Sequence, residues 1–173
     1  MENSFNDIEN KLKIKLIKAQ EDAIQVMLLK LDEFIQEDVY NYYATDNENA
    51  GETYVPTREV FEMFDSIKSY IKGNTVYGAI GVAGTKGFKN VNIIHRKSTW
   101  THDTQDENGD FYLPKPADIV TIINEGLSEE ESLFGRIYAR PFWDNFKKWC
   151  LENYSDILLD CCLKNDIPVK RQM

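Results

Sequence analysis

The sequence predicts an α+β fold with a long N-terminal helix, an antiparallel β-sheet built of hairpins, and a long C-terminal helix packed on the sheet. Three observations lead to this prediction. Apolar residues recur every three or four positions through the first part of the chain, and they alternate with polar residues from Ser66. An amphipathic segment then follows Pro141. We expect a single domain over residues 1–173, because this length suits one compact core.

The first helix is predicted over about residues 5–42, since no Gly or Pro interrupts the chain before Gly51. A helix of that length measures roughly 55 Å at 1.5 Å per residue, which exceeds what one small core needs. Two interpretations stay open: one end packs on a neighbouring subunit, or a kinked helix folds wholly onto its own domain. The stripe consists of Phe5, Ile8, Leu12, Leu16, Ala19, Ala23, Met27, Leu31 and Phe34.

A polar, acidic loop and a short helix are expected next. The loop covers about residues 45–52, and the short helix runs from Glu59 to about Asp65. Tyrosines gather on both sides of the loop, which is typical of a recognition surface but also of the edge of a core. The candidate interaction residues of this region are Tyr40, Tyr43, Tyr54 and Arg58.

The sheet is predicted over about residues 66–113. Its first hairpin turns at Gly73-Asn74 and returns through Thr75 to Val82. A second hairpin is indicated by Asn108-Gly109, a pair that favours a tight two-residue turn. Residues 117–124 form either a helix or a strand, of which we favour the helix.

The last helix is predicted over about residues 141–164. Pro141 suits its first position, because the ring presets a helical φ and the missing N–H would be unpaired there in any case. Arg140 is pushed toward an extended conformation by the proline that follows it. We expect Glu125, which precedes Gly126, to cap backbone N–H groups or to pair with an arginine, Arg140 being one candidate. We expect Phe142 to anchor the helix on the sheet, and Trp143 belongs to the same structural motif.

Charge and composition exclude some classes of protein. The net charge of −9 argues against a general nucleic-acid binder, which needs a basic surface. No apolar run reaches the roughly 20 residues of a membrane helix, and the acidic start lacks the pattern of a signal peptide, so we expect an intracellular product. We interpret the three cysteines as reduced thiols packed as small hydrophobic side chains. They are Cys150, Cys161 and Cys162.

Three motifs resemble a phosphate, calcium or zinc site, and each lacks a residue that the site requires. The glycines from Gly78 to Gly84 lack the Gly-Lys-Ser/Thr order of a phosphate loop. Residues 104–115 would place a lysine where a calcium loop needs a bidentate carboxylate. His95 and His102 have no third ligand nearby, as a zinc site requires. We therefore predict no enzyme activity, no metal and no cofactor.

A local basic run contains Lys86 and Lys89 and continues to Arg96 and Lys97 without an acidic residue between them. Such a run can contact a phosphate backbone or an acidic partner, and it is also typical of a solvated loop. Lys86 and Lys89 are therefore kept as candidate interaction residues.

The order of these features resembles that of the tail-completion, or neck, proteins of tailed bacteriophages, a family of minor tail components. The motifs that carry the resemblance are Tyr43, Tyr54, Thr57-Arg58, Asp65-Ser66, Glu125-Gly126 with Ser128, and Ala139-Arg140-Pro141-Phe142. The chain departs from the family pattern in the order Thr57-Arg58, in the missing residue between Glu125 and Gly126, and in Asp144-Asn145 where the family has Pro-Ala.

The resemblance implies a non-enzymatic structural subunit of the virion, made in the host cytoplasm. It would form a ring, expected to be a hexamer, between the head connector and the tail terminator or tail tube, through which DNA passes without sequence-specific binding. A rival interpretation is a small acidic protein-binding module, such as an immunity protein that binds a toxin. The acidic charge and the Tyr and Trp content suit that alternative.

Overall fold

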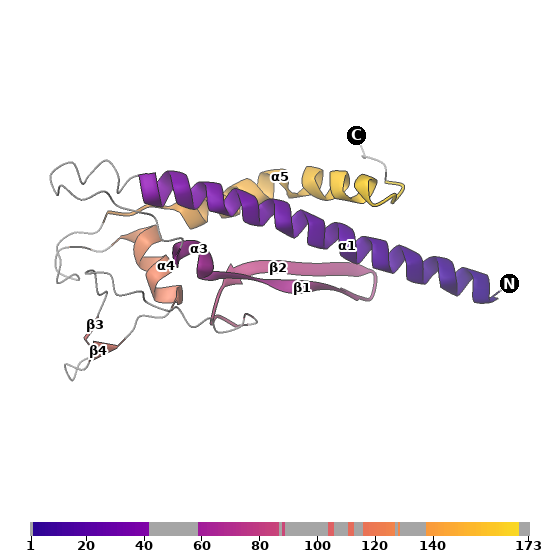
Figure 1. Ribbon diagram of the computed structural model, residues 1–173, viewed down its shortest axis with the longest axis horizontal. Coiled ribbons are helices and arrows are strands. Elements are labelled where there is room, and N and C mark those ends of the chain that lie inside the picture. The colour runs from indigo at the N-terminus through magenta and orange to yellow at the C-terminus, as the bar shows by residue number, and fades with distance from the viewer. Residues whose placement is uncertain are drawn as a thin grey trace. The chain divides into compact units, whose positions relative to one another are not determined.

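The computed structural model describes residues 2–41, 59–86, 88, 104–105, 111–112, 116–126, 128 and 138–169. These residues form the predicted α+β fold, with a long helix at each end and antiparallel hairpins between them (Figure 1). By their contacts they divide into two compact units. The first unit contains Met1–Asp32, Ser66–Ile80 and Phe146–Met173, and the second contains Glu33–Asp65 and Gly81–Asn145.

Helix α1 (Glu2–Ile35) continues through a π-helical turn, η1 (Gln36–Tyr40), to Asn41. The long N-terminal helix predicted over about 5–42 is therefore confirmed. The π turn brings Val39 and Tyr40 into the core of the second unit, where the Tyr40 hydroxyl accepts a hydrogen bond of 3.2 Å from the backbone N–H of Val60. A π turn shifts the register of the side chains that follow it, which the regular spacing of a sequence pattern does not reveal.

Helix α3 (Glu59–Glu62) is shorter than predicted. It ends at Glu62, and strand β1 (Phe64–Lys72) already begins two residues later, so Asp65 belongs to the strand and not to the helix. The backbone N–H of Ala83 donates to the carbonyl of Met63 at 2.8 Å, which holds this junction next to the end of the hairpin. The hydrogen bonding of the strand pair has extended the strand backward at the expense of the short helix.

Strands β1 and β2 (Thr75–Val82) pair as the first predicted hairpin. Its turn uses Gly73 at φ +60°, a left-handed conformation that glycine adopts without steric cost. Side chains alternate along β1 as predicted, with Ser69 buried between exposed Lys68 and Tyr70.

The second predicted hairpin is present as strands β3 (Thr104–Gln105) and β4 (Phe111–Tyr112). They pair antiparallel, with Thr104 opposite Tyr112 and Gln105 opposite Phe111. Among the described residues the two hairpins belong to separate two-stranded sheets. The strand considered over residues 91–95 lies outside the described residues.

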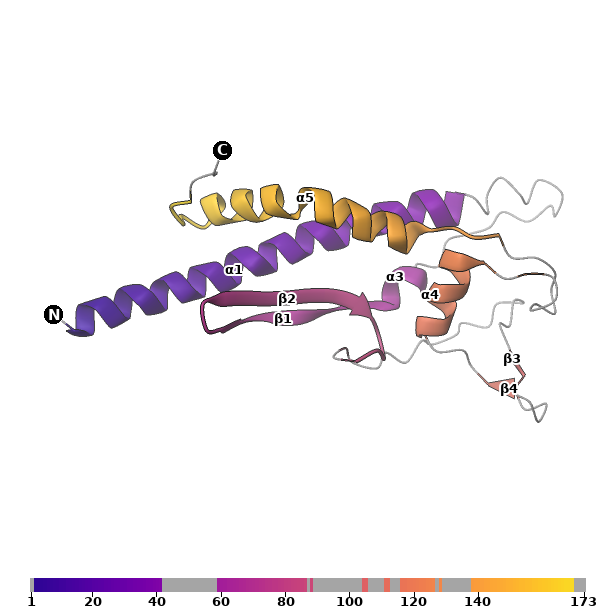
Figure 2. The same cartoon turned by 180° about the vertical axis from the view of Figure 1, so that it is seen from behind.

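Within the first unit, α1 lies between the β1–β2 hairpin and helix α5 (Phe142–Lys164), as Figures 1 and 2 show. The hairpin approaches α1 closely at Gly78, where a Cβ atom would lie 2.6 Å from Ile24 Cδ1 and 3.0 Å from Ser69 Oγ. On the other side, the Tyr154 hydroxyl of α5 donates to Oε1 of the buried Gln20 at 2.7 Å. The close approach of helix and hairpin therefore depends on the absence of a side chain at Gly78.

The apolar stripe of α1 meets α5 in a buried cluster. Its small members allow the two helices to approach closely, since alanine and cysteine project little beyond the backbone. The predicted packing of the cysteines as small hydrophobic side chains is confirmed for Cys161 and Cys162. The buried members are Ala19, Ala23, Cys161, Cys162 and Ile167.

Helix α5 ends in a Schellman motif. Asp166 takes the left-handed position at φ +54°, its N–H donates to the Leu163 carbonyl at 3.0 Å, and the Ile167 N–H donates to the Cys162 carbonyl at 3.0 Å. The helix therefore ends shortly before Pro168, close to the predicted boundary.

Candidate functional site

The joint between helix α4 (Pro116–Glu125) and helix α5 contains the residues that the sequence singles out. Residues 117–124 are helical, so the preferred prediction is confirmed. Gly126 ends α4 at φ +78°, and its N–H donates to the Ile122 carbonyl at 2.8 Å. Glycine is the residue that this left-handed helix end favours, which accounts for the Glu125-Gly126 pair as a structural stop.

Asn124 joins the two helices. It is buried, and its Oδ1 accepts hydrogen bonds from the backbone N–H groups of Trp143 at 3.2 Å and Asp144 at 3.3 Å. Its Nδ2 donates to the Asp144 carboxylate at 2.9 Å. These N–H groups are the ones that a polar N-cap side chain normally satisfies, and Pro141, which precedes the helix, has no side-chain acceptor. The last turn of α4 therefore caps the start of α5.

Pro141 immediately precedes helix α5, whereas the sequence predicts it as the first residue of the helix. Helix α5 begins at Phe142, and Pro141 supplies the carbonyl that accepts the first intrahelical hydrogen bond, from Asn145 N–H at 2.8 Å. The joint as a whole is as expected, since Arg140-Pro141 stands at the entry to the helix and the ring fixes the φ angle there.

Arg140 is bound to α4 through its backbone and is buried. Its N–H donates to the Ile123 carbonyl at 2.9 Å. The expected ion pair between Arg140 and Glu125 is not present among the described residues. The Glu125 side chain is exposed. A glutamate at an exposed helix end keeps its hydration, and Asn124 makes the contacts that close the joint.

Phe142 and Trp143 anchor the joint on the sheet. The Phe142 ring is fully buried and meets Phe64 of β1 edge-on, with ring centroids 6.1 Å apart. The Trp143 ring lies 4.8 Å from the same phenylalanine. Aromatic pairs at these separations stabilise a fold beyond the area that they bury. The predicted packing of the C-terminal helix on the sheet is thus carried by its first turn.

An open depression lies beside the joint, with a volume of about 370 Å³. One edge is acidic, and Asp38 accepts a hydrogen bond of 3.1 Å from the Asn145 amide. The lining contains no cysteine, serine or histidine that could serve as a nucleophile or as a base near neutral pH. The depression therefore combines two carboxylates with the guanidinium of Arg140. It is lined by Glu37, Asp38, Asn41, Ala139, Arg140, Pro141 and Asn145.

The structure describes two of the remaining predicted interaction residues, Tyr40 and Lys86. Tyr40 is buried and hydrogen-bonded within the second unit, which agrees with the edge of a core and not with a recognition surface, the two interpretations left open for it. Lys86 is exposed in the turn after β2. Tyr43, Tyr54, Arg58 and Lys89 lie outside the described residues.

No pattern in the sequence predicts the role of Asn124. Its role depends on a contact with residues about twenty positions further along the chain, and no local pattern around an asparagine at a helix end indicates such a partner.

The described residues contain no group of three or more His, Cys, Asp or Glu side chains placed to hold a metal ion. His95 and His102 lie outside these residues, so the absence of a metal stays a prediction. Burial raises the pKa of the Cys150 thiol to about 11, and burial likewise raises the pKa of Cys161 and Cys162. The three thiols are free and protonated at neutral pH, which makes them poor nucleophiles.

None of the described helices combines the length and the apolar character needed to cross a membrane. Comparison of the chain with family models, with curated proteins and with solved structures yields no significant match in any of the three.

Proposed function

We propose that this chain is a structural subunit of the neck of a tailed bacteriophage. In this role it would form a ring of six copies that joins the head connector to the tail and lets DNA pass. Nothing in the proposal requires catalysis.

The observation that carries the proposal is the extent of helix α1. Its apolar stripe begins three turns before the packed part of the helix, with Phe5 and Ile8 about two-thirds exposed. A helix that carries apolar residues beyond its own core is expected where subunits pack on one another. The order of motifs gives the second support, since Ala139-Arg140-Pro141-Phe142 opens the last helix as it does in the neck proteins that the sequence resembles.

The proposal is tested in virions. Deletion of the gene from a phage that encodes it should leave filled heads and finished tails that do not join, and the wild-type gene supplied from a plasmid should restore joined particles. Antibody labelling should place the protein at the neck in electron micrographs. Infectious, normally joined particles that lack the protein would contradict the proposal.

A small acidic binding module is the second candidate, and one observation favours it. The second unit holds 19 Asp and Glu against 8 Lys and Arg, for a net charge of −11. Such a surface suits a basic partner protein. A stable 1:1 complex with a basic partner, formed by a chain that never associates with itself, would favour this function over the neck.

A further inference from the structure

The first turns of α1 expose an apolar stripe that is continuous with the core. Phe5, Ile8 and Leu12 are 70%, 62% and 42% exposed, and they lie on the same helix face as the buried Ala19 and Ala23. The same face is therefore core in one part of the helix and surface in another.

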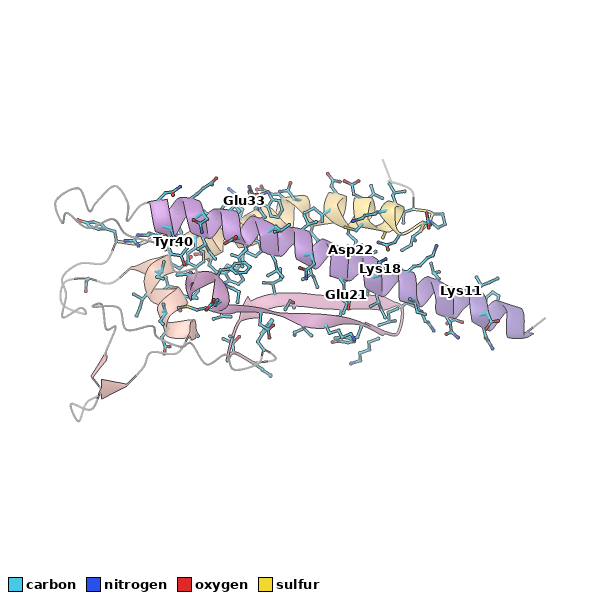
Figure 3. The ribbon with its side chains drawn as sticks, in the orientation of Figure 1. Lys11, Lys18, Glu21, Asp22, Glu33 and Tyr40 are labelled. Atoms are coloured by element: carbon cyan, nitrogen blue, oxygen red, sulfur yellow. The ribbon has the colours of Figure 1, made fainter. Side chains whose placement is uncertain are left out.

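Lysines flank this exposed stripe. Residues 10–20 contain four lysines and no acidic residue. Lys13 pairs with Glu9, and Lys15 lies 3.7 Å from the Asp166 carboxylate. Lys11 and Lys18 are exposed and make no ion pair among the described residues. This part of the helix therefore carries exposed apolar side chains together with exposed lysines. Figure 3 labels Lys11 and Lys18 on α1.

The negative charge of the chain is concentrated elsewhere. The first unit has 12 Lys and Arg against 10 Asp and Glu, for a net charge of +2, whereas the second unit has −11, and the two values make the −9 of the whole chain. The end of α1 that belongs to the second unit carries Glu33, Glu37 and Asp38 within six residues. It is also the negative end of the helix dipole.

We infer that the exposed end of α1, residues 5–18, docks on the acidic end of α1 in a second copy of this chain, at the depression that Glu37 and Asp38 line. The inference rests on the proposed function in that it names the contact between neighbouring subunits. Charge complementarity identifies the occupant, because one surface offers Lys11 and Lys18 and the other offers carboxylates. The two surfaces differ, so the contact repeats from copy to copy and builds a ring or a filament.

The size of the stripe predicts how the contact behaves. Stable protein interfaces bury about 1,200–2,000 Å² in total, which three side chains on one helix do not reach. Association should therefore depend on both the apolar stripe and the lysines, and it should weaken as salt screens the charges over a Debye length of about 8–10 Å.

The first experiment is sedimentation velocity over a range of concentrations in low salt. The wild-type chain should associate, and Phe5→Ser/Ile8→Ser should weaken its association at least tenfold without lowering the melting temperature. The control is Leu151→Ser, which removes a leucine that is 87% exposed on α5 and should change nothing. A wild-type chain that stays monomeric at every concentration would overturn the inference, and so would an equal loss in the control.

The second experiment reverses charges to identify the occupant. Lys11→Glu/Lys18→Glu and Glu33→Lys/Glu37→Lys should each fail to associate alone, and an equimolar mixture of the two should recover association. The control Lys148→Glu/Lys164→Glu removes two exposed lysines of α5 and should behave as wild type. A mixture that does not recover would overturn the acidic end of α1 as the partner surface.

The third measurement separates this contact from the binding of an anionic membrane. Sedimentation with vesicles that contain phosphatidylserine should leave the wild-type chain in the supernatant, and binding that Phe5→Ser/Ile8→Ser abolishes would overturn the inference. Failure here is distinguishable from failure of the proposed function. A chain found at the phage neck that joins its neighbours through another surface fails only this inference, and a chain that associates as described but is absent from virions fails only the proposed function.

Discussion

The two halves of the apolar stripe on α1 have opposite environments. Its first members, Phe5, Ile8 and Leu12, are exposed, whereas Ala19, Ala23 and Leu31 are fully buried. Both halves follow the same spacing of three and four residues, and both form the same continuous helix. The difference shows that periodicity reports which residues share a helix face, and that only tertiary structure reports what covers this face.

The largest expected effect compares one substitution at two places on α1. Leu31→Ala should lower the free energy of unfolding by about 2–5 kcal/mol, because the side chain is fully buried and its removal leaves a cavity. Leu12→Ala, at 42% exposure, should stay within about 0.5–1 kcal/mol. Urea denaturation followed by circular dichroism measures both. Equal losses would mean that the first turns of α1 are buried within the free subunit.

The next expected effect concerns Gly78, where the hairpin approaches α1 closely. Gly78→Ala should destabilise the fold by about 1–3 kcal/mol, because the new methyl group would overlap Ile24 Cδ1. Ile24→Val removes that atom, so the double variant should lose less than the sum of the two single variants. Thermal melts of the four proteins provide the cycle, and strictly additive losses would contradict the proposed close contact.

A third comparison concerns neighbouring residues at the α4–α5 joint. Asn124→Ala should cost about 1–2 kcal/mol, because the N–H groups of Trp143 and Asp144 lose their acceptor. Glu125→Ala, one residue further along, should change the stability by no more than about 0.5 kcal/mol, since its side chain is exposed. Chemical denaturation of both variants checks this, and the reverse ranking would restore Glu125 as the residue that closes the joint.

The smallest expected effect is on the dependence of stability on pH. The folded protein holds the Cys150 proton to a pKa of about 11, against 9.0 for an ordinary thiol. The contribution of this raised pKa to the free energy of unfolding is therefore fully present below about pH 9. It falls as the pH rises toward 11, because the unfolded chain loses the proton first. Melting temperatures from pH 8 to pH 11 should fall less steeply for Cys150→Ala than for the wild-type chain. Parallel curves would show that Cys150 does not contribute.

Much of the fold could be predicted because its signals are local. The spacing of apolar residues identified α1 and α5, and the turn at Gly73-Asn74 identified the first hairpin together with its partner strand. Such patterns act through backbone geometry, which depends on near neighbours in the chain. The end of α3 was missed because strand pairing, which is a longer-range effect, drew Phe64 and Asp65 into β1.

The candidate site could be predicted only in outline. The Arg140-Pro141 entry to α5 could be predicted from the fixed φ angle and missing N–H of proline. The capping by Asn124 depends on a contact between two helices, and the burial of Tyr40 depends on a π turn. Neither depends on a local sequence pattern.

The most direct test of how copies join is disulfide cross-linking between Leu12→Cys and Asn41→Cys placed in the same chain. The two positions are separated by about 44 Å along one continuous helix at 1.5 Å per residue, far beyond the 4.4–6.8 Å between Cα atoms that a disulfide spans. Mild oxidation should therefore produce a ladder of covalent oligomers that a reducing agent dissolves. Monomers alone, or only the dimers that Leu12→Cys forms without Asn41→Cys, would contradict an assembly in which the exposed end of α1 docks on the acidic end of the next copy.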